Sequence, residues 1–426
     1  MRPFSHHRIA VAVTVLAAVA VAAAAGRATS TGSAWTRISG PTQAGSQLGL
    51  ARSADGVLHV IWNRGNSPTS IFETRLSPAG KAAGTSTVAT GWQGNNGLGL
   101  VVMPDKTLRL FAVGAGGVNT FTAPSTGGHW TLQSGVSWGG AVAESAYVIG
   151  ATVAKDGQPV TAWRGYAAAG VPPGSIPQDG YEGGMTESFL ATDAAGGAIV
   201  LSGATNAGQG GVYVQRVLPS PGPRVVLPPL GKEWGNGLSG RIGAAGVYVA
   251  YADGKAARLY RYGGRSRTLA TGAYSSATLC AGPGGRLWIA WGDNAGNVSV
   301  TRSNRAASAL EPVQRLKLPA GALTFLQCEG STGPADLFAS AQLNGGFWHA
   351  HVPAQFALSA QATRTTVTIS ARDAGDPVAG ATIKVGGKQL RTAANGKVSL
   401  TLRPGSYSAS AVAAGYSPAS VRVSVR

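Results

Sequence analysis

The chain has 426 residues, of which 63 are glycine and only 12% are charged, and its formal net charge is +18. No heptad repeat or long stretch with a period of 3.6 residues occurs, which excludes coiled-coil and mainly helical folds. The Thr, Val, Ser, Gly and Tyr content is typical of all-β proteins.

The positive charge favours an anionic partner such as a wall polymer or an acidic polysaccharide. A coding bias toward Arg is the alternative explanation, because the Arg residues are scattered. No nucleic-acid-binding motif is present, so we expect no nucleic-acid partner.

The first 25 residues are predicted to be a signal peptide. Arg2 and Arg8 precede a run of 17 Ala, Val, Ile, Leu and Thr residues, 9–25, which ends in three alanines suited to cleavage. The alternative is an uncleaved anchor helix, for which 17 residues is the lower limit of length. We expect no transmembrane segment after residue 25, and therefore a secreted or cell-wall-associated protein.

A pattern of two apolar stretches joined by a Gly or Asp turn recurs seven times between Leu48 and Val352, at spacings of 39 to 51 residues. Repeats of this length are typical of solenoids and propellers. In the first repeat, strands are expected at Leu48–Ser53, Val57–Trp62, Ser70–Leu76 and Thr85–Trp92. Four short antiparallel strands per repeat predict a seven-bladed β-propeller over residues 34–355. Six or eight blades are the alternatives, because the fourth repeat is irregular.

The two ends of this region predict how the ring closes. The seventh repeat has strands at Leu323–Gln327, Ala335–Ala341 and Phe347–Val352 but no fourth strand, while Ala34–Ser39 is a strand without a repeat. Pairing this first strand with the last repeat would complete a blade and remove the open edges. Over residues 34–355 the period and strand pattern resemble the sialidase-like and lectin-like propeller group.

The chain has two cysteines, Cys280 and Cys328, which lie at matching places in successive repeats. An oxidising compartment and adjacent equivalent strands favour one disulfide between them. Two separate buried thiols are the alternative.

The residues from 360 to 426 form a second predicted unit. Its motifs are Val378-Ala379-Gly380-Ala381-Thr382-Ile383, then Asn395-Gly396 before a strand, Pro404-Gly405-Ser406-Tyr407, and Gly415-Tyr416. These motifs resemble the carboxypeptidase regulatory-like family, which implies a small transthyretin-like β-sandwich. Residues 364–426 contain nine Lys and Arg residues against Asp373 and Asp376, a net charge of 9 − 2 = +7. A structural spacer and a module that binds anionic or glycan surfaces are both consistent with this composition.

Tryptophans recur at two places in the repeats, at the ends of second strands and before the loops that join repeats. If these rings gather on one propeller face, they could stack on sugars; packing between blades is the alternative. The candidate ligand-binding residues are Trp62, Trp92, Trp138, Trp163, Trp234, Trp291, Arg64, Arg164, Glu144 and Asp293. A long insertion, Tyr166–Glu187, could overhang the same face.

No catalytic signature is present in the sequence. Glu144 with Asp179 or Glu182 could supply the two carboxylates of a glycoside hydrolase, but their spacing does not require it. His349 and His351 share one strand face, but no third metal ligand lies nearby in the sequence, so an ordinary strand is the preferred interpretation.

We expect no cofactor and no metal. The sequence thus favours a non-catalytic recognition protein that binds carbohydrate, with a sialidase-like hydrolase or a protein-binding scaffold as alternatives.

Overall fold

The computed structural model describes residues 35–40, 47–64, 69–94, 97–138, 148–163, 166–170, 174–176, 185–192, 199–205, 212–227, 239–243, 246–319, 323–341 and 345–426. The predicted signal peptide lies outside these residues. They form β-strands joined by turns, with one short 3-10 helix, Pro283–Gly285. No helix among them has the length and apolarity needed to cross a bilayer. The predicted all-β fold is confirmed.

Between Thr36 and Val352 the described residues form seven four-stranded antiparallel sheets. The first three sheets contain β2 (Gly49–Arg52), β3 (Leu58–Asn63), β4 (Thr69–Leu76) and β5 (Ala82–Trp92), then β6 (Leu98–Val102), β7 (Leu108–Gly114), β8 (Gly117–Ala123) and β9 (Thr131–Trp138), then β10 (Ile149–Val153), β11 (Pro159–Trp163), β12 (Tyr166–Ala169) and β13 (Gly174–Ile176). The next two contain β14 (Met185–Thr192), β15 (Ile199–Thr205), β16 (Val212–Leu218) and β17 (Val225–Val226), then β18 (Ser239–Gly243), β19 (Gly246–Ala252), β20 (Ala256–Arg261) and β21 (Ser266–Thr271). The last two contain β22 (Tyr274–Ala281), β23 (Leu287–Asp293), β24 (Asn297–Arg302) and β25 (Gln314–Lys317), then β26 (Leu323–Glu329), β27 (Ala335–Ala341) and β28 (Phe347–Val352) with β1 (Thr36–Arg37).

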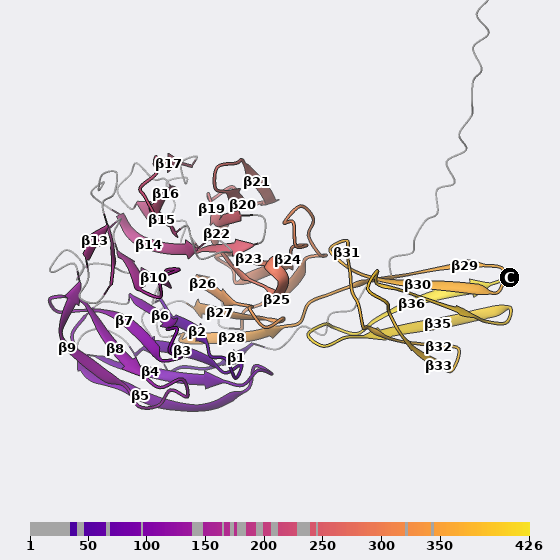
Figure 1. Cartoon of the computed structure of the whole chain (residues 1–426), viewed down its shortest axis with the longest axis horizontal. Helices are drawn as coiled ribbons and strands as arrows, with labels where there is room; N and C mark the ends of the chain where they lie inside the picture. Colours follow the sequence, from indigo (N-terminus) through magenta and orange to yellow (C-terminus); the bar gives the residue numbers. More distant parts are fainter. Residues whose placement is uncertain are drawn as a thin grey trace, which may run out of the picture.

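The sheets follow one another around a propeller in chain order (Figure 1). The first strand of each sheet contacts the first strand of the next, and β26 contacts β2. The predicted closure is confirmed, because β1 pairs with β28 through Thr36 opposite His349 and Arg37 opposite Trp348. The count of seven complete blades stays a prediction.

In three of the sheets, an aspartate side chain stabilises the turn of the first hairpin. The side chain of Asp55 accepts the backbone N–H of Val57, and Asp105 and Asp156 accept the N–H two residues on in the same way. An aspartate that bonds the backbone two residues ahead stabilises a tight turn. The same turn chemistry therefore starts three successive sheets.

Two glutamines join neighbouring sheets near the centre of the propeller. The side-chain oxygen of Gln47 accepts the backbone N–H groups of Leu98 and Ile149, and its amide donates to the Ile149 carbonyl. Gln327 accepts from the Leu48 N–H at 2.7 Å and donates to the Leu48 carbonyl at 3.0 Å. Each amide thus satisfies buried backbone groups where one sheet meets the next.

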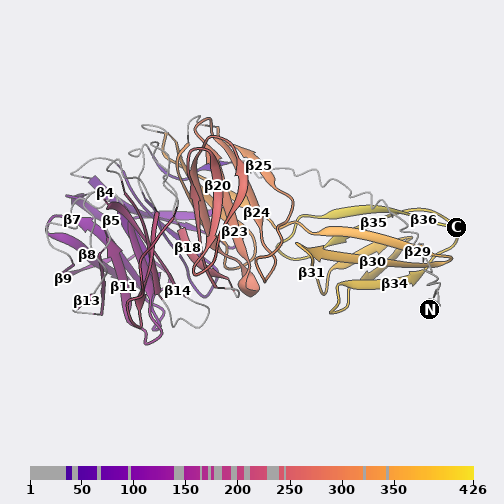
Figure 2. The same ribbon diagram turned by 90° about the horizontal axis from the view of Figure 1, so that it is seen from above.

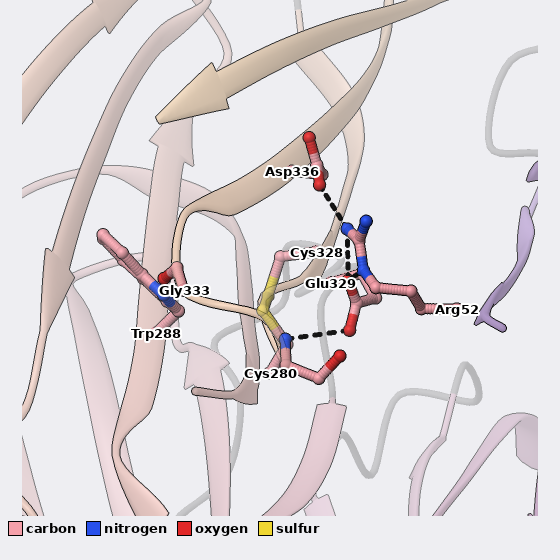
Figure 3. Close-up of a disulfide and its surroundings, with 8 residues drawn as sticks. Arg52, Cys280, Trp288, Cys328, Glu329, Gly333 and Asp336 are labelled. Carbon is pink, nitrogen blue, oxygen red and sulfur yellow. Dashed lines mark hydrogen bonds and ion pairs between the residues drawn. A yellow bond between two sulfur atoms is a disulfide. The ribbon is translucent and has the colours of Figure 1, made fainter. Parts of the chain in front are cut away.

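The predicted disulfide between Cys280 and Cys328 is confirmed, with the two Cα atoms 5.6 Å apart. It joins β22 to β26, the first strands of the last two sheets (Figure 3). The bond links two sheets across a loop of 48 residues.

A separate C-terminal unit follows the propeller and extends away from it (Figure 2). One of its sheets contains β29 (Ala357–Thr363), β30 (Thr366–Asp373), β31 (Asp376–Pro377) and β34 (Lys397–Thr401); the other contains β32 (Thr382–Val385), β33 (Lys388–Arg391), β35 (Gly405–Val412) and β36 (Ala419–Val425). Both sheets contribute to a single apolar core that includes Ile369, Ile383 and Val423. The first strand of the unit, β29, begins at Ala357, and the domain boundary at residue 360 stays a prediction. Membership of the carboxypeptidase regulatory-like family stays a prediction.

Candidate functional site

The structure places three of the predicted ligand-binding tryptophans inside the core. Trp62, Trp163 and Trp291 are 5%, 5% and 2% exposed. Trp62 stacks on Phe72 with ring centroids 4.7 Å apart, and Trp291 packs edge-on against Tyr274. These burials correct the expectation that the second-strand tryptophans form a stacking surface. A large ring at this position fills the space inside and between sheets.

The remaining predicted site residues are not brought together among the described residues. Trp92 is half-buried, and its indole N–H donates to the Val113 carbonyl. Asp293 accepts two hydrogen bonds from Asn297 and thereby closes a turn between strands, and Arg64 is exposed. Trp138 ends β9. Three predicted residues lie outside the described residues: Glu144, Arg164 and Trp234.

A pocket of about 410 Å³ lies at the centre of the propeller, between the first strands of the sheets. Its wall is mainly Val, Leu and Ala, with Thr152 and Thr192 among the polar residues. Arg52 and Glu329 also line it, but their side chains are bonded to each other at 2.6 Å. Most of the side chains that line the pocket are therefore apolar, and the two charged ones bond each other.

Arg52 belongs to a buried charged cluster beside the disulfide. Its guanidinium donates to both Glu329 and Asp336, and all three side chains are at most 3% exposed (Figure 3). Asp336 Oδ1 also contacts His349 Nε2 and His351 Nδ1, each at 2.8 Å. Burial alone would raise the pKa of Asp336, but the hydrogen bonds from the two histidines outweigh it and hold that pKa well below its usual range.

Asp336 is not among the site residues predicted from the sequence, although it contacts both histidines. Asp336 lies opposite His351 in the register of β27 and β28, so its side chain falls on the same face of the sheet. The preference for an ordinary strand rested on the absence of a third nearby ligand in the sequence. A carboxylate one strand away supplies that third group.

A second buried cluster joins the first two sheets. Glu73 of β4 contacts His59 Nδ1 at 2.6 Å and accepts hydrogen bonds from the Gly128 N–H and the Trp130 indole. Burial works to raise the pKa of Glu73, but these donors together lower it. Because His59 and Glu73 are fully buried and satisfied, the cluster is a structural joint.

A third cluster joins the propeller to the C-terminal unit. The Arg302 guanidinium lies between the rings of Trp288 and Tyr416, 5.2 and 4.9 Å from their centroids. It donates to Asp373 Oδ2 at 2.5 Å and contacts Glu311 at 3.3 Å. This arrangement satisfies an arginine that is only 3% exposed.

A second propeller arginine completes this junction. Arg286 lies 3.0 Å from Asp373 and donates to Asp376 at 2.8 Å. Asp373 and Asp376 are the only acidic residues between 357 and 426. Both carboxylates of the C-terminal unit are therefore paired with arginines of the propeller.

Among the described residues, no acidic side chain forms an ion pair with a cation of the C-terminal unit. Eight of its nine Lys and Arg side chains are exposed: Arg364, Lys384, Lys388, Arg391, Lys397, Arg403, Arg422 and Arg426. In the sheet of β32, β33, β35 and β36, Lys384 lies on the outer face, since Ile383 and Val385 on either side are buried. Arg391 and Arg422 share this face by register and alternation. Strand residues between them are mainly serines.

Comparison with known proteins supports the fold. The chain is similar to a catalytically inactive virginiamycin B lyase from Staphylococcus aureus with quinupristin, at 11% identity and a TM-score of 0.50, over 75% of this chain and 98% of that one. It also matches a structure described as the Dos1 propeller, at 13% identity and a TM-score of 0.43, over 72% of this chain and 78% of that one. No protein-family model and no curated protein matches the chain. The first of these similarities supports a propeller fold for this chain.

Proposed function

We propose that the protein is an exported or cell-wall-associated, non-catalytic recognition protein that binds an anionic extracellular polymer, such as an acidic polysaccharide or a phosphate-rich wall polymer. The observation that carries the proposal is the charge arrangement of the C-terminal unit. Its exposed ionic groups are cations, because Asp373 and Asp376 are paired with Arg302 and Arg286 at the junction. A surface with one sign of charge attracts a polymer of the opposite sign.

The sheet that carries Lys384, Arg391 and Arg422 suits an extended polymer. These three cations project from one face, and Ser408 and Ser410 on β35 lie between Lys384 and Arg422. Cations would bind acidic groups of the polymer, and hydroxyls would bond its neutral oxygens. The propeller would contribute a second contact, for which Trp92 is a candidate stacking residue because its ring is partly exposed.

The test is binding of the chain from Gly26 onward, the mature form that the signal prediction implies, to poly(glycerol phosphate), polygalacturonate and neutral dextran. We expect binding to the two anionic polymers, with affinity that falls as salt screens the charges. Binding to dextran alone, or to none of the three, would contradict the proposal. A protein-binding scaffold would be the better interpretation if none of the three bound, and a site for neutral sugars if dextran alone did.

A matched pair of triple variants locates the surface. In one, Lys384, Arg391 and Arg422 are replaced by Gln. In the other, the exposed propeller residues Lys81, Lys155 and Arg265 are replaced by Gln, which removes the same total charge. We expect the first triple variant to lose most of the binding and the second to keep it. Equal losses in both would assign the attraction to overall charge alone.

A further inference from the structure

Three side chains of the types that bind metal ions converge on the last sheet of the propeller. His349 and His351 project from one face of β28, and Asp336 projects from the same face of β27. The nitrogen and oxygen atoms that these residues would offer to a metal lie within 4.8 Å of one another. Two of the three separations, from each histidine nitrogen to Asp336 Oδ1, are 2.8 Å. No other such group of three occurs among the residues with described positions.

The spacing of these atoms suits a small divalent ion. Zinc binds imidazole nitrogen and carboxylate oxygen at about 2.0–2.2 Å, so neighbouring ligand atoms in a tetrahedral site lie roughly 3.3 Å apart. An ion at this place would replace the protons of the two hydrogen bonds to Asp336 Oδ1. Each of these 2.8 Å distances would have to increase by only about 0.5 Å.

The surroundings of Asp336 support an ion in two ways. Arg52 donates to Asp336 Oδ2, so the other oxygen, Oδ1, is the one left toward the histidines. A ligating carboxylate is commonly held by an outer hydrogen bond of this kind. In addition, Glu329 and Asp336 together carry two negative charges against the single positive charge of Arg52. With neutral imidazoles the cluster has one net negative charge, which favours a cation.

The site also opens to solvent on one side. His349 and Asp336 are buried, but the His351 side chain is 26% exposed. It lines an open pocket of about 440 Å³ between the propeller and the C-terminal unit, with Pro78, Pro334 and Tyr416 on the walls. Gly80 makes room for the imidazole, because a Cβ at that position would lie 2.7 Å from the His351 ring.

From this geometry we propose that Asp336, His349 and His351 bind a divalent transition-metal ion, with zinc the best fit, and leave one coordination position open toward the pocket. Two imidazoles favour zinc, cobalt, nickel or copper over magnesium and calcium. Three protein ligands with an open fourth position differ from the closed four-ligand set of structural zinc sites. A water or a ligand oxygen that enters the pocket would complete the coordination. The inference is independent of the polymer binding proposed above.

The first test is calorimetric titration of the metal-stripped chain, from Gly26 onward, with Zn²⁺. We expect one ion per chain. His351→Ala and Asp336→Asn should each weaken binding by more than the roughly 10–100-fold typical of outer-shell changes. His129→Ala is the matched control, because His129 is an exposed propeller histidine outside the cluster, and its affinity should equal that of the unmodified chain. Absence of binding by the unmodified chain, or unchanged affinity in His351→Ala, would overturn the inference.

A second measurement keeps the inference testable if a variant fails to fold. The unmodified chain is loaded with Co²⁺, and its visible absorption is recorded. Intense bands typical of four-coordinate cobalt are expected, and they should shift when a small anion such as azide occupies the open position. Only the weak absorption of six-coordinate aqueous Co²⁺ would show that the three side chains form a hydrogen-bonded cluster without an ion.

Discussion

Arg302 of the propeller donates a 2.5 Å hydrogen bond to Asp373 of the C-terminal unit, and their side chains are 3% and 0% exposed. The same Asp373 oxygen accepts the Tyr416 hydroxyl at 2.7 Å. A buried carboxylate with several donors holds two folded units in one relative position. The junction thus includes charged groups that are buried and bonded to one another.

Removal of this arginine should loosen the junction. Arg302→Ala leaves Asp373 buried with less positive charge around it, and breaking a buried ion pair from one side costs about 3–5 kcal/mol. The measurement is the free energy of unfolding from urea titration. Arg258→Ala is the control: Arg258 pairs with Asp253 but is 29% exposed, so its loss should cost about 0–1 kcal/mol. Equal effects of the two variants would contradict the predicted role of burial.

Glu311 should make stability depend on pH. Burial, and then its contact with Asp373, raise the pKa of Glu311 from 4.5 to about 9. The folded protein therefore keeps a proton that the unfolded chain releases above pH 4.5, and the free energy of unfolding contributed by this group falls as pH rises toward 9.

Glu311→Gln, which resembles the protonated form, should remove that decline. We expect thermal melts to show a growing advantage of Glu311→Gln over the unmodified chain between pH 5 and 9. Glu73→Gln should instead be less stable than the unmodified chain, because the pKa of Glu73 is lowered and its ionised form stabilises the fold above pH 4.5. This deficit should shrink as pH falls below 4.5. A constant difference between Glu311→Gln and the unmodified chain across this range would count against the prediction.

The seam between the last and first sheets should depend on Gln327. Gln327→Ala leaves the buried N–H and carbonyl of Leu48 without their side-chain partner. An unsatisfied buried polar group costs about 1–3 kcal/mol. Chemical denaturation should show this loss, whereas Gln389→Ala on an exposed edge strand should change little. No difference between the two variants would mean that water replaces the Gln327 amide.

Loss of the disulfide should lower the free energy of unfolding by one of the larger amounts predicted here. Replacing Cys280 and Cys328 together by Ala removes a link across 48 residues, which corresponds to about 4 kcal/mol in the chain-entropy model. Equilibrium unfolding measures the difference. As an independent check, unreduced protein unfolded in urea should contain no thiol that reacts with a labelling reagent, and two reactive thiols would refute the bond in solution.

The strands could be predicted from sequence because each carries its own signal. Ala335–Ala341 and Phe347–Val352 were predicted with the bounds that β27 and β28 have, since apolar stretches bounded by turn residues indicate strands locally. The Cys280–Cys328 bond was predicted because the two residues occupy equivalent positions in adjacent repeats. These inferences require only the repeat and its period.

The clusters could not be predicted because they depend on contacts between distant segments. Asp336 meets His349 only through the register of β27 and β28, and Asp373 meets Arg302 only where two folded units touch. The burial of the tryptophans could not be predicted either. A recurring ring such as Trp163 has the same sequence signature whether it is presented to a ligand or packed in the core, and only the fold distinguishes the two.

The disulfide also determines how the molecule would respond to mechanical tension. A pull on the C-terminal unit enters the propeller at Val352, the end of β28, in the sheet that the two-residue strand β1 completes. Because Cys328 of that sheet is bonded to Cys280 of the neighbouring one, the load passes covalently into a second sheet. The last sheet would therefore stay attached to its neighbour under load, which suits the polymer binding that we propose.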